Sequence, residues 1–149
     1  MIGVASVTRL TVEHAEAAAR VHRASFDDRL PWLAGLHTPE EDEWFYRTVV
    51  FARSTVWGTF DADALVAVMA IRPGWIDQLY VLPGHQGRGI GTALLEVAKT
   101  GASELELWTF QRNAPARRFY ERHGFVAVEQ TDGAGNEERE PDVRYRWIA

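Results

Sequence analysis

Three glycines alternate with other residues at positions 87, 89 and 91, between an apolar run and a segment of helical character. Glycine allows a sharp turn and a close approach of the backbone to a ligand. The helix that follows begins with unpaired backbone N–H groups and with the positive end of its dipole. These groups can bind a phosphate without a lysine. We therefore predict a phosphate-binding turn here, with a tight strand-to-helix corner as the alternative interpretation.

The spacing of these glycines argues against two common phosphate-binding motifs. Counted from Gly87 or Gly89, the third glycine of a dinucleotide-binding fingerprint falls on Thr92 or Leu94. The chain also lacks the Gly-Lys-Ser/Thr triplet that a P-loop requires. A dehydrogenase fragment is therefore an improbable interpretation of this turn.

A second segment carries polar and small residues at helical spacing. Asn113, Ala116 and Tyr120 are three and four residues apart, so one face of a helix presents all of them. The small residue between two polar ones leaves room for a ligand along this face. The alternative is an ordinary amphipathic helix with Asn113 as its N-cap and Gly124 as its C-cap.

Composition limits the class of protein. The chain has 149 residues, a net charge of -5 and 46% hydrophobic residues, which suits one globular domain and disfavours a nucleic-acid partner. It has no cysteine, so disulfides, thiolate metal sites and cysteine nucleophiles are excluded. The histidines show no metal-ligand spacing, and we expect no metal. No apolar run approaches the roughly 20 residues of a membrane span. The first ten residues do not read as a signal peptide, so we expect a cytoplasmic protein that does not bind membranes.

The hydrophobic periodicity predicts the elements that position these residues. Helices are expected over residues 12–26, 39–50, 89–100 and 113–123, and strands over 5–10, 54–60, 64–72, 75–82, 105–109, 125–130 and 143–148. The first three long strands are joined by short turns and should be antiparallel. The helix after the glycine turn makes strands 75–82 and 105–109 parallel. The fold class is therefore α/β (α+β), with a mixed sheet of about seven strands and about four helices on both faces.

Taken together, the two segments resemble a known superfamily. Gln86-Gly87-Arg88-Gly89-Ile90-Gly91 is similar to the Gln/Arg-x-x-Gly-x-Gly/Ala acetyl-CoA signature of the Gcn5-related N-acetyltransferases (GNAT). The pattern from Asn113 to Phe125 resembles that family's downstream motif. The motifs cover roughly residues 75–125, and the expected element order extends the resemblance to nearly the whole chain. It implies a single N-acetyltransferase domain over residues 1–149 that binds acetyl-CoA.

The resemblance also implies roles for the residues that match its motifs. Backbone groups of Leu79 and Val81 would pair with the pantetheine arm, and Asn113 would hydrogen-bond to it. Ala116 leaves room for the ligand, and Phe119 would pack near it. Gln86 begins the signature and belongs to the implied cofactor site. The pyrophosphate would be held by the N–H groups of the turn, which are those of Gly87, Arg88, Gly89, Ile90, Gly91 and Thr92.

Two residues are candidates for the chemistry of acetyl transfer. Tyr120 would lie near the thioester sulfur and protonate the departing thiolate, because a phenol with a pKa of about 10 is a suitable donor. Its alternative role is that of a core tyrosine. Asp77 is the candidate general base, because strand alternation places it on the face of Leu79 and Val81. The family's best-known base position falls on Trp75, so three alternatives for Asp77 stay open: it orients a cationic amine, relays a proton through water, or is a solvated carboxylate at the strand end.

The acceptor site is predicted less sharply. In this family the loop between the first two helices forms one wall of the acceptor site, and here that loop contains Asp28, Trp32 and His37. Trp32 can equally cover the core, and His37 can equally be a surface residue. Trp108 and Phe110 lie near the diverging ends of the parallel strands. The acidic residues Glu137, Glu138 and Asp142 would attract a basic substrate, or form only a solvated loop.

The predicted function is direct transfer of an acetyl group from acetyl-CoA to a primary amine of a small molecule or peptide. The alternative is a non-catalytic module that binds or senses acyl-CoA on the same fold. The sequence leaves open whether the protein is a monomer or a homodimer.

Overall fold

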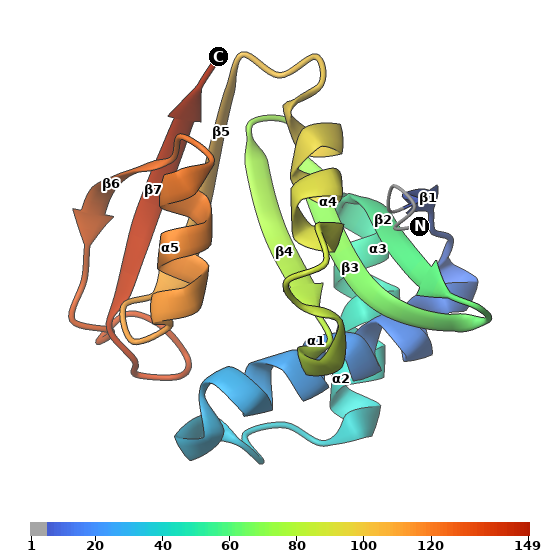
Figure 1. Cartoon of the computed structure of the whole chain (residues 1–149). Coiled ribbons are helices and arrows are strands. Elements are labelled where there is room, and N and C mark those ends of the chain that lie inside the picture. Colours follow the sequence, from blue (N-terminus) through green and yellow to red (C-terminus); the bar gives the residue numbers. More distant parts are fainter. Residues whose placement is uncertain (1–5) are drawn as a thin grey trace.

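The computed structural model describes residues 6–149, which form one mixed seven-stranded sheet with helices on both faces (Figure 1). Along the sheet the strands follow the order β1-β2-β3-β4-β5-β7-β6. Their bounds are Thr8–Arg9, Thr55–Asp61, Ala64–Arg72, Trp75–Val81, Glu104–Phe110, Val126–Gln130 and Asp142–Ile148 for β1 to β7 in turn. The seven expected strands are thereby confirmed, although Ala5 of the first one lies outside the described residues.

The helices match the expected ones with small shifts at their ends. A single 3-10 turn over Val12–His14 leads into α1, Ala15–Arg29, which runs three residues past its expected end. The second helix is made of α2 (Pro39–Phe45), a π turn (Tyr46–Val50) and α3 (Phe51–Arg53). Short 3-10 turns occupy Pro31–Leu33 and Pro83–His85, and α4 and α5 span Ile90–Lys99 and Ala114–Arg122. Over residues 6–149, no helix has the length and apolarity needed to cross a bilayer.

Local sequence explains why the second helix starts where it does. Thr38 Oγ1 accepts a hydrogen bond from the Glu41 N–H (3.1 Å), and the Glu41 carboxylate accepts one from the Thr38 N–H (2.8 Å). This reciprocal cap, with Pro39 at the first helical position, fixes the start of the helix. The hydrogen bond from the Thr38 N–H, together with one from its side chain, lowers the pKa of the Glu41 carboxyl.

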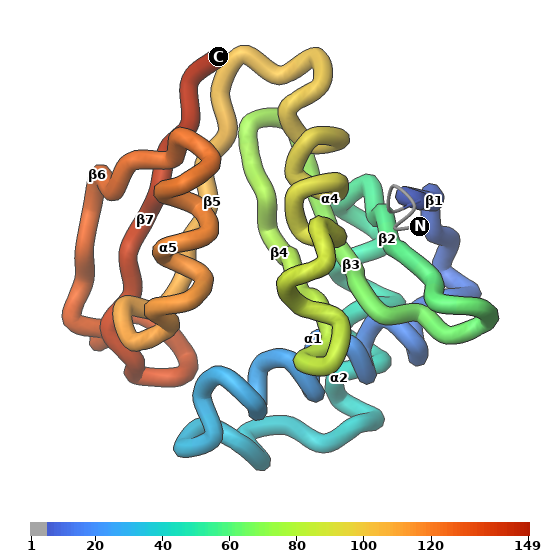
Figure 2. The backbone as a smooth tube through the Cα atoms, in the orientation of Figure 1, coloured from blue at the N-terminus to red at the C-terminus, as the bar shows by residue number. Residues whose placement is uncertain are grey.

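Two apolar layers hold the helices on the sheet. On one face, Ile90, Leu94 and Leu95 of α4 and Tyr120 of α5 pack on β3, β5 and β7. On the other face, α1 and the π turn pack on β2 and β3. The helices α4 and α5 stand side by side in front of the sheet, whereas α1 and α2 lie behind it (Figures 1 and 2).

The centre of the sheet is divided where β4 and β5 diverge. These parallel strands pair only at Trp75 and Glu106, although both continue for several residues beyond that point. Figure 1 shows the two strands separating toward their C-terminal ends. A strand that loses its neighbour leaves backbone N–H and C=O groups without partners, so the divergence prepares a place for a ligand.

Candidate active site

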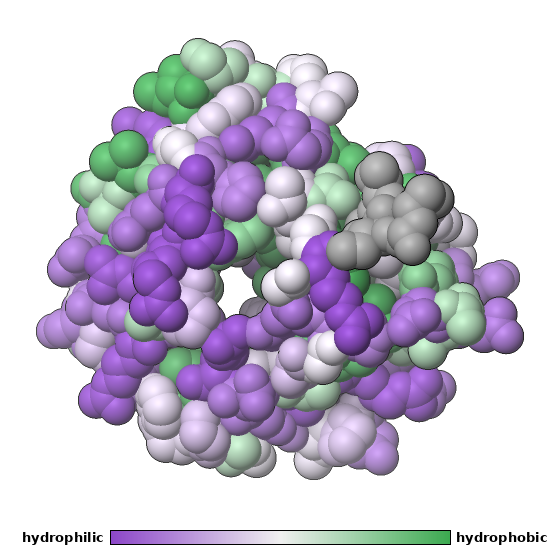
Figure 3. Space-filling model, in the orientation of Figure 1, coloured by the Kyte–Doolittle hydropathy of each residue, from purple (hydrophilic) through white to green (hydrophobic). Residues whose placement is uncertain are grey.

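A cavity of about 530 Å³ occupies the divergence between β4 and β5. It is lined by these two strands, the glycine turn, α5 and the C-terminal end of α1. The space-filling view shows an opening through the molecule between α5 and β4 (Figure 3). This volume is typical of small-molecule sites, and an opening at both sides would let two ligands approach each other from opposite faces.

The glycine turn borders this cavity and leaves its backbone donors free. Gly87 and Gly89 have φ angles of +79° and +82°, a left-handed conformation that favours glycine. A β-carbon at either position would meet no atom within 4 Å, so the turn faces open space. The N–H groups of residues 89–92 make no backbone hydrogen bond within residues 6–149. Free donors at the start of a ten-residue helix are of the kind that can bind an anion, as predicted for this turn.

The backbone of β4 offers further free groups. The Leu82 N–H bonds to Val66 O (2.9 Å), so Leu79 and Val81, which alternate with Leu82, turn their backbone groups away from β3 and toward the divergence. The Val81 carbonyl already accepts Ser25 Oγ and Gln86 Nε2, both at 2.9 Å. Both groups of Leu79 and the N–H of Val81 therefore remain for an amide-containing ligand.

The side chain of Gln86 has a positioning role in this structure. Its amide N–H donates to the Val81 carbonyl (2.9 Å), and its carbonyl accepts from the Arg29 guanidinium. These contacts fix the glycine turn to the end of β4 and to α1. Ile90 is buried in the core, so only its backbone N–H can serve the predicted anion site, whereas the exposed Arg88 is not among the residues that line the cavity.

The α5 segment brings its matched residues to the opposite wall of the cavity. Asn113 caps α5, with Oδ1 accepting from the Ala116 N–H (3.3 Å), and its side chain also lines the cavity. Ala116 and Phe119 line the cavity as well. A β-carbon at Gly91 would lie only 3.2 Å from the Phe119 ring, so glycine at 91 lets α5 approach the start of α4.

Tyr120 is a buried phenol at the edge of the cavity. Its ring packs against Phe119, Phe125 and Tyr145, with centroids 5.3, 5.6 and 6.3 Å away. Its hydroxyl has no hydrogen-bond partner among residues 6–149, and the residue lines the cavity. Burial raises the pKa of Tyr120 above its ordinary value, so the hydroxyl carries its proton at neutral pH.

Asp77 does not share the face of Leu79 and Val81, and the alternation argument was wrong at this residue. Ile71 pairs with Ile76 but Ala70 pairs with Gln78, so Asp77 is the extra residue of a β-bulge. Asp77 instead forms a bidentate ion pair with Arg72, at 2.6 and 3.0 Å. Its side chain is 27% exposed and still lines the cavity.

The bulge places Asp77 on the side of the sheet that holds α1. Trp75 pairs with Arg72, and the Arg72 guanidinium lies 5.3 Å from the centre of the Trp75 ring. In β5 the corresponding face carries Trp108, which lines the cavity and is 42% exposed. Asp77 and Trp108 therefore flank the cavity on the face away from α4 and α5.

The predicted acceptor residues of the α1–α2 segment lie outside the cavity lining. Asp28 is exposed, and Trp32 donates from Nε1 to the buried Glu140 carboxylate (2.9 Å). The Arg112 guanidinium lies 5.1 Å from the centre of the Trp32 ring. Trp32 thus ties the segment after α1 to the β6–β7 loop, and the two chain segments lie close together in Figure 2.

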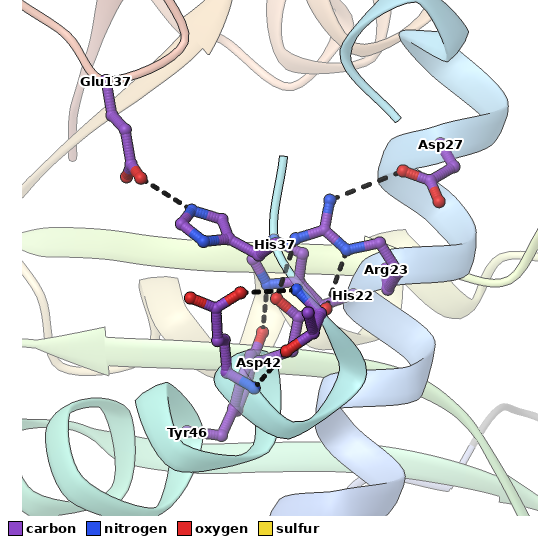
Figure 4. Close-up of polar contacts among 9 residues, drawn as sticks. His22, Arg23, Asp27, His37, Asp42, Tyr46 and Glu137 are labelled. Atoms are coloured by element: carbon purple, nitrogen blue, oxygen red, sulfur yellow. Dashed lines mark hydrogen bonds and ion pairs between the residues drawn. The ribbon is translucent and has the colours of Figure 1, made fainter. Parts of the chain in front are cut away.

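A second contact joins the segment after α1 to the β6–β7 loop, and a polar network joins α1 to α2 (Figure 4). His37 pairs with Glu137 of the β6–β7 loop at 2.7 Å, so it is more than the free surface residue that was one interpretation. Asp42 of α2 receives two bonds from Arg23 of α1, at 2.8 and 2.9 Å. These contacts fix α1, α2 and the β6–β7 loop relative to one another beside the cavity.

His22 is a half-buried titratable group in the same cluster of contacts. Its Nδ1 lies 2.7 Å from the Tyr46 hydroxyl, and its ring stacks on Tyr80 with centroids 4.2 Å apart. Burial, with the nearby charge of Arg23, lowers the pKa of His22 to about 3. His22 is therefore neutral at physiological pH.

The structure brings further residues to the cavity that sequence reasoning missed. Among them are the three arginines 29, 118 and 122. The imidazole of His85 also lines the cavity: its Nε2 pairs with Asp61 (3.0 Å), and its Nδ1 is buried without a hydrogen-bond partner among residues 6–149. The helical spacing of Arg118 and Arg122 was visible in the sequence, but which face of α5 points to the cavity was not.

Comparison with known proteins identifies the family. A family model described as "Acetyltransferase (GNAT) domain" matches residues 52–127, half of the chain. The mycothiol acetyltransferase of Beutenbergia cavernae is 34% identical over 130 residues, covering 78% of this chain and 42% of that protein. The peptidyl-lysine N-acetyltransferase YjaB of Salmonella typhimurium is 26% identical over 128 residues, covering 85% and 87%.

A solved structure shows the same fold over the full length. Apo-form YjaB from Escherichia coli superposes with a TM-score of 0.80 at 23% identity, covering 99% of both chains. The chain spans only 28%, 42% and 51% of the length of the first three curated relatives that it matches. With the matched family model and the full-length agreement in fold, the chain belongs to the GNAT acetyltransferase family.

Proposed function

We propose that this protein transfers an acetyl group from acetyl-CoA directly to a primary amine. One observation carries the proposal: a single cavity joins free backbone donors at a helix start, an unpaired strand edge and an unpaired phenol. The sequence contains no cysteine, so a cysteine-linked acyl-enzyme is excluded. Direct attack of the amine on the thioester is the simplest chemistry that these groups support.

The residues present fit acetyl-CoA. The free N–H groups from Gly89 to Thr92 suit the pyrophosphate. The backbone groups of Leu79 and Val81 that face the divergence suit the amides of the pantetheine arm, which would add to β4 as a strand does. Asn113 borders the same channel. When bound, acetyl-CoA supplies the activated acetyl group.

Tyr120 is the proposed general acid. Its proton is retained at neutral pH because burial raises its pKa, and its hydroxyl is not engaged by another described residue. The same burial raises the pKa of a thiol at this place, so the departing sulfur is basic enough to accept the proton. The ring is fixed by Phe119 and Phe125, so the hydroxyl needs little reorganisation.

Asp77 is proposed to orient the acceptor amine. Two hydrogen bonds from Arg72 fix its carboxylate beside the cavity, which suits a group that positions a cation. Trp108 would form the apolar side of the same entrance. The relatives are named as a mycothiol acetyltransferase and a peptidyl-lysine N-acetyltransferase, and we propose an amine of a small molecule or peptide for this chain. A cytoplasmic location stays a prediction.

The test is a release assay for free thiol with acetyl-CoA and a panel of amines. The panel contains polyamines, amino acids, aminoglycosides and lysine-containing peptides. Release that depends on one class of amine, with an acetylated product of the expected mass, would support the proposal. Tight binding of acetyl-CoA without turnover on any amine would favour the alternative of a non-catalytic sensor.

A further inference from the structure

Two arginines on α5 face the cavity without a carboxylate partner. Arg118 and Arg122 are four residues apart, so they share one face of the helix. Neither forms an ion pair or a side-chain hydrogen bond with any residue from 6 to 149. Like charges at this spacing repel each other and destabilise a helix slightly, so the pair has an electrostatic reason to bind an anion.

The neighbouring Arg117 shows what a structural arginine on this helix looks like. Its Nε donates to the Tyr145 hydroxyl at 3.0 Å and its guanidinium reaches the Gln111 carbonyl at 3.4 Å. Arg117 is therefore turned toward β7 and is absent from the cavity lining. The docking of α5 thus separates one satisfied arginine from two that face the cavity.

The pair lies beside the predicted pyrophosphate site. Phe119, between the two arginines in sequence, approaches Gly91 of α4 closely. Thr92 Oγ1 of α4 and His123 Nε2, which follows Arg122, lie 3.1 Å apart. The two arginines are thereby placed next to the start of α4, on the same rim of the cavity as its free N–H groups.

The charge of this rim runs against that of the whole chain. The net charge is -5. Among the cavity-lining residues, however, the charged side chains are the three arginines 29, 118 and 122, the acid Asp77, and His85 when it is protonated. Asp77 is paired with Arg72 on the other side of the sheet. The rim at α4 and α5 therefore attracts anions in a protein that otherwise repels them.

We propose that Arg118 and Arg122 bind the 3′-phosphate of coenzyme A. This inference rests on the proposed function, because it assumes that the pyrophosphate occupies the start of α4. The remaining charged group of the ligand is then the 3′-phosphate, a monoester with a charge between about -1.5 and -2 at neutral pH. Guanidinium groups suit such a dianion through paired N–H donors.

Dephospho-CoA, which lacks only the 3′-phosphate, gives a direct test. Calorimetry measures the Kd of CoA and of dephospho-CoA for the wild type, for the Arg118→Gln/Arg122→Gln double variant and for Arg53→Gln. Arg53, an exposed arginine of α3 outside the cavity lining, controls for the loss of positive charge.

We expect the double variant to lose affinity for the ligand that carries the 3′-phosphate and to keep its affinity for the one that lacks it. Each exposed ion pair contributes up to about 1 kcal/mol, so the double variant should weaken CoA binding roughly tenfold. Binding of dephospho-CoA should change less than about twofold, and Arg53→Gln should affect neither ligand. The wild type should bind CoA more tightly than dephospho-CoA, and this difference in affinity should decrease at higher salt concentration, because salt screens exposed charges.

Other outcomes would overturn the inference in distinguishable ways. If the double variant lost affinity equally for CoA and dephospho-CoA, the arginines would bind the pyrophosphate and not the 3′-phosphate. If its affinity for both ligands were unchanged, the arginines would have no role in binding. If the wild type bound neither ligand, the proposed function itself would fail, and this inference with it. The melting temperature of the ligand-free double variant checks its fold. It should not fall, because the substitution removes a repulsion.

Discussion

Tyr120→Phe separates the chemistry of this site from its stability. The substitution keeps the ring, with its contacts to Phe119, Phe125 and Tyr145, and removes only the hydroxyl. That hydroxyl makes no hydrogen bond within residues 6–149. No other described group loses a partner, so the free energy of unfolding should change by less than about 1 kcal/mol.

The effect on turnover should be much larger. Loss of a general acid typically costs a factor of 10² to 10⁴. We expect kcat to fall roughly 10²-fold, which corresponds to about 2.7 kcal/mol of transition-state stabilisation. The Kd of acetyl-CoA should change little, because the ring still borders the cavity. Since burial raises the pKa of Tyr120, the wild type should show no loss of rate from ionisation of this phenol below about pH 10.

Tyr145→Phe is a matched control in the same apolar layer. The Tyr145 hydroxyl donates to Glu121 (2.6 Å) and accepts from Arg117 (3.0 Å), and Tyr145 does not line the cavity. Its removal takes a hydrogen-bond partner from two charged groups and should cost about 1–3 kcal/mol of stability. Its effect on turnover should be small, the reverse of the pattern expected for Tyr120→Phe.

Urea unfolding and thiol-release kinetics, measured on both variants with one good acceptor, provide the assay. Retention of more than half of the wild-type kcat in Tyr120→Phe would refute the assignment of Tyr120 as the acid. A similar loss of turnover in both variants would show that the effect comes from disturbed packing.

Substitutions at three further positions test the anion site, the His22 imidazole and the acceptor site. Gly89→Asp should abolish acetyl-CoA binding in calorimetry whereas Gly89→Asn weakens it less, since both residues tolerate the left-handed backbone but only Asp repels phosphate; equal losses would contradict an anion site. Unfolded His22 takes up a proton near pH 6.5 but the folded form only near pH 3, so this group should lower stability as the pH falls between these values, by up to about 1.4 kcal/mol per unit; urea unfolding should show a shallower dependence on pH for His22→Gln than for the wild type. Asp77→Asn should lower kcat/KM for a cationic acceptor without changing the Kd of acetyl-CoA, and superimposable pH–rate profiles of both proteins would reduce Asp77 to a surface ion pair.

Much of the fold followed from short-range patterns. The capping residues Thr38 and Glu41, the turns between strands and the apolar stripe of α4 depend on neighbours within a few residues, so the sequence displays them directly. The parallel pairing of β4 with β5 also followed, because a helix connects the two strands. The positions that match the family motifs line the cavity or border it, because they lie on elements that these short-range patterns predict.

The placement of individual side chains required the tertiary structure. The bulge that turns Asp77 away from Leu79 arises from the register between β3 and β4, and strand alternation within one segment contains no information about it. Likewise, Arg117 and Arg118 are adjacent in sequence, yet the docking of α5 on β7 turns one toward Tyr145 and the other toward the cavity. The sequence determined which elements form and which residues each one offers. The packing of those elements decided which face meets the ligand, because a face is defined only relative to a neighbour distant in the chain.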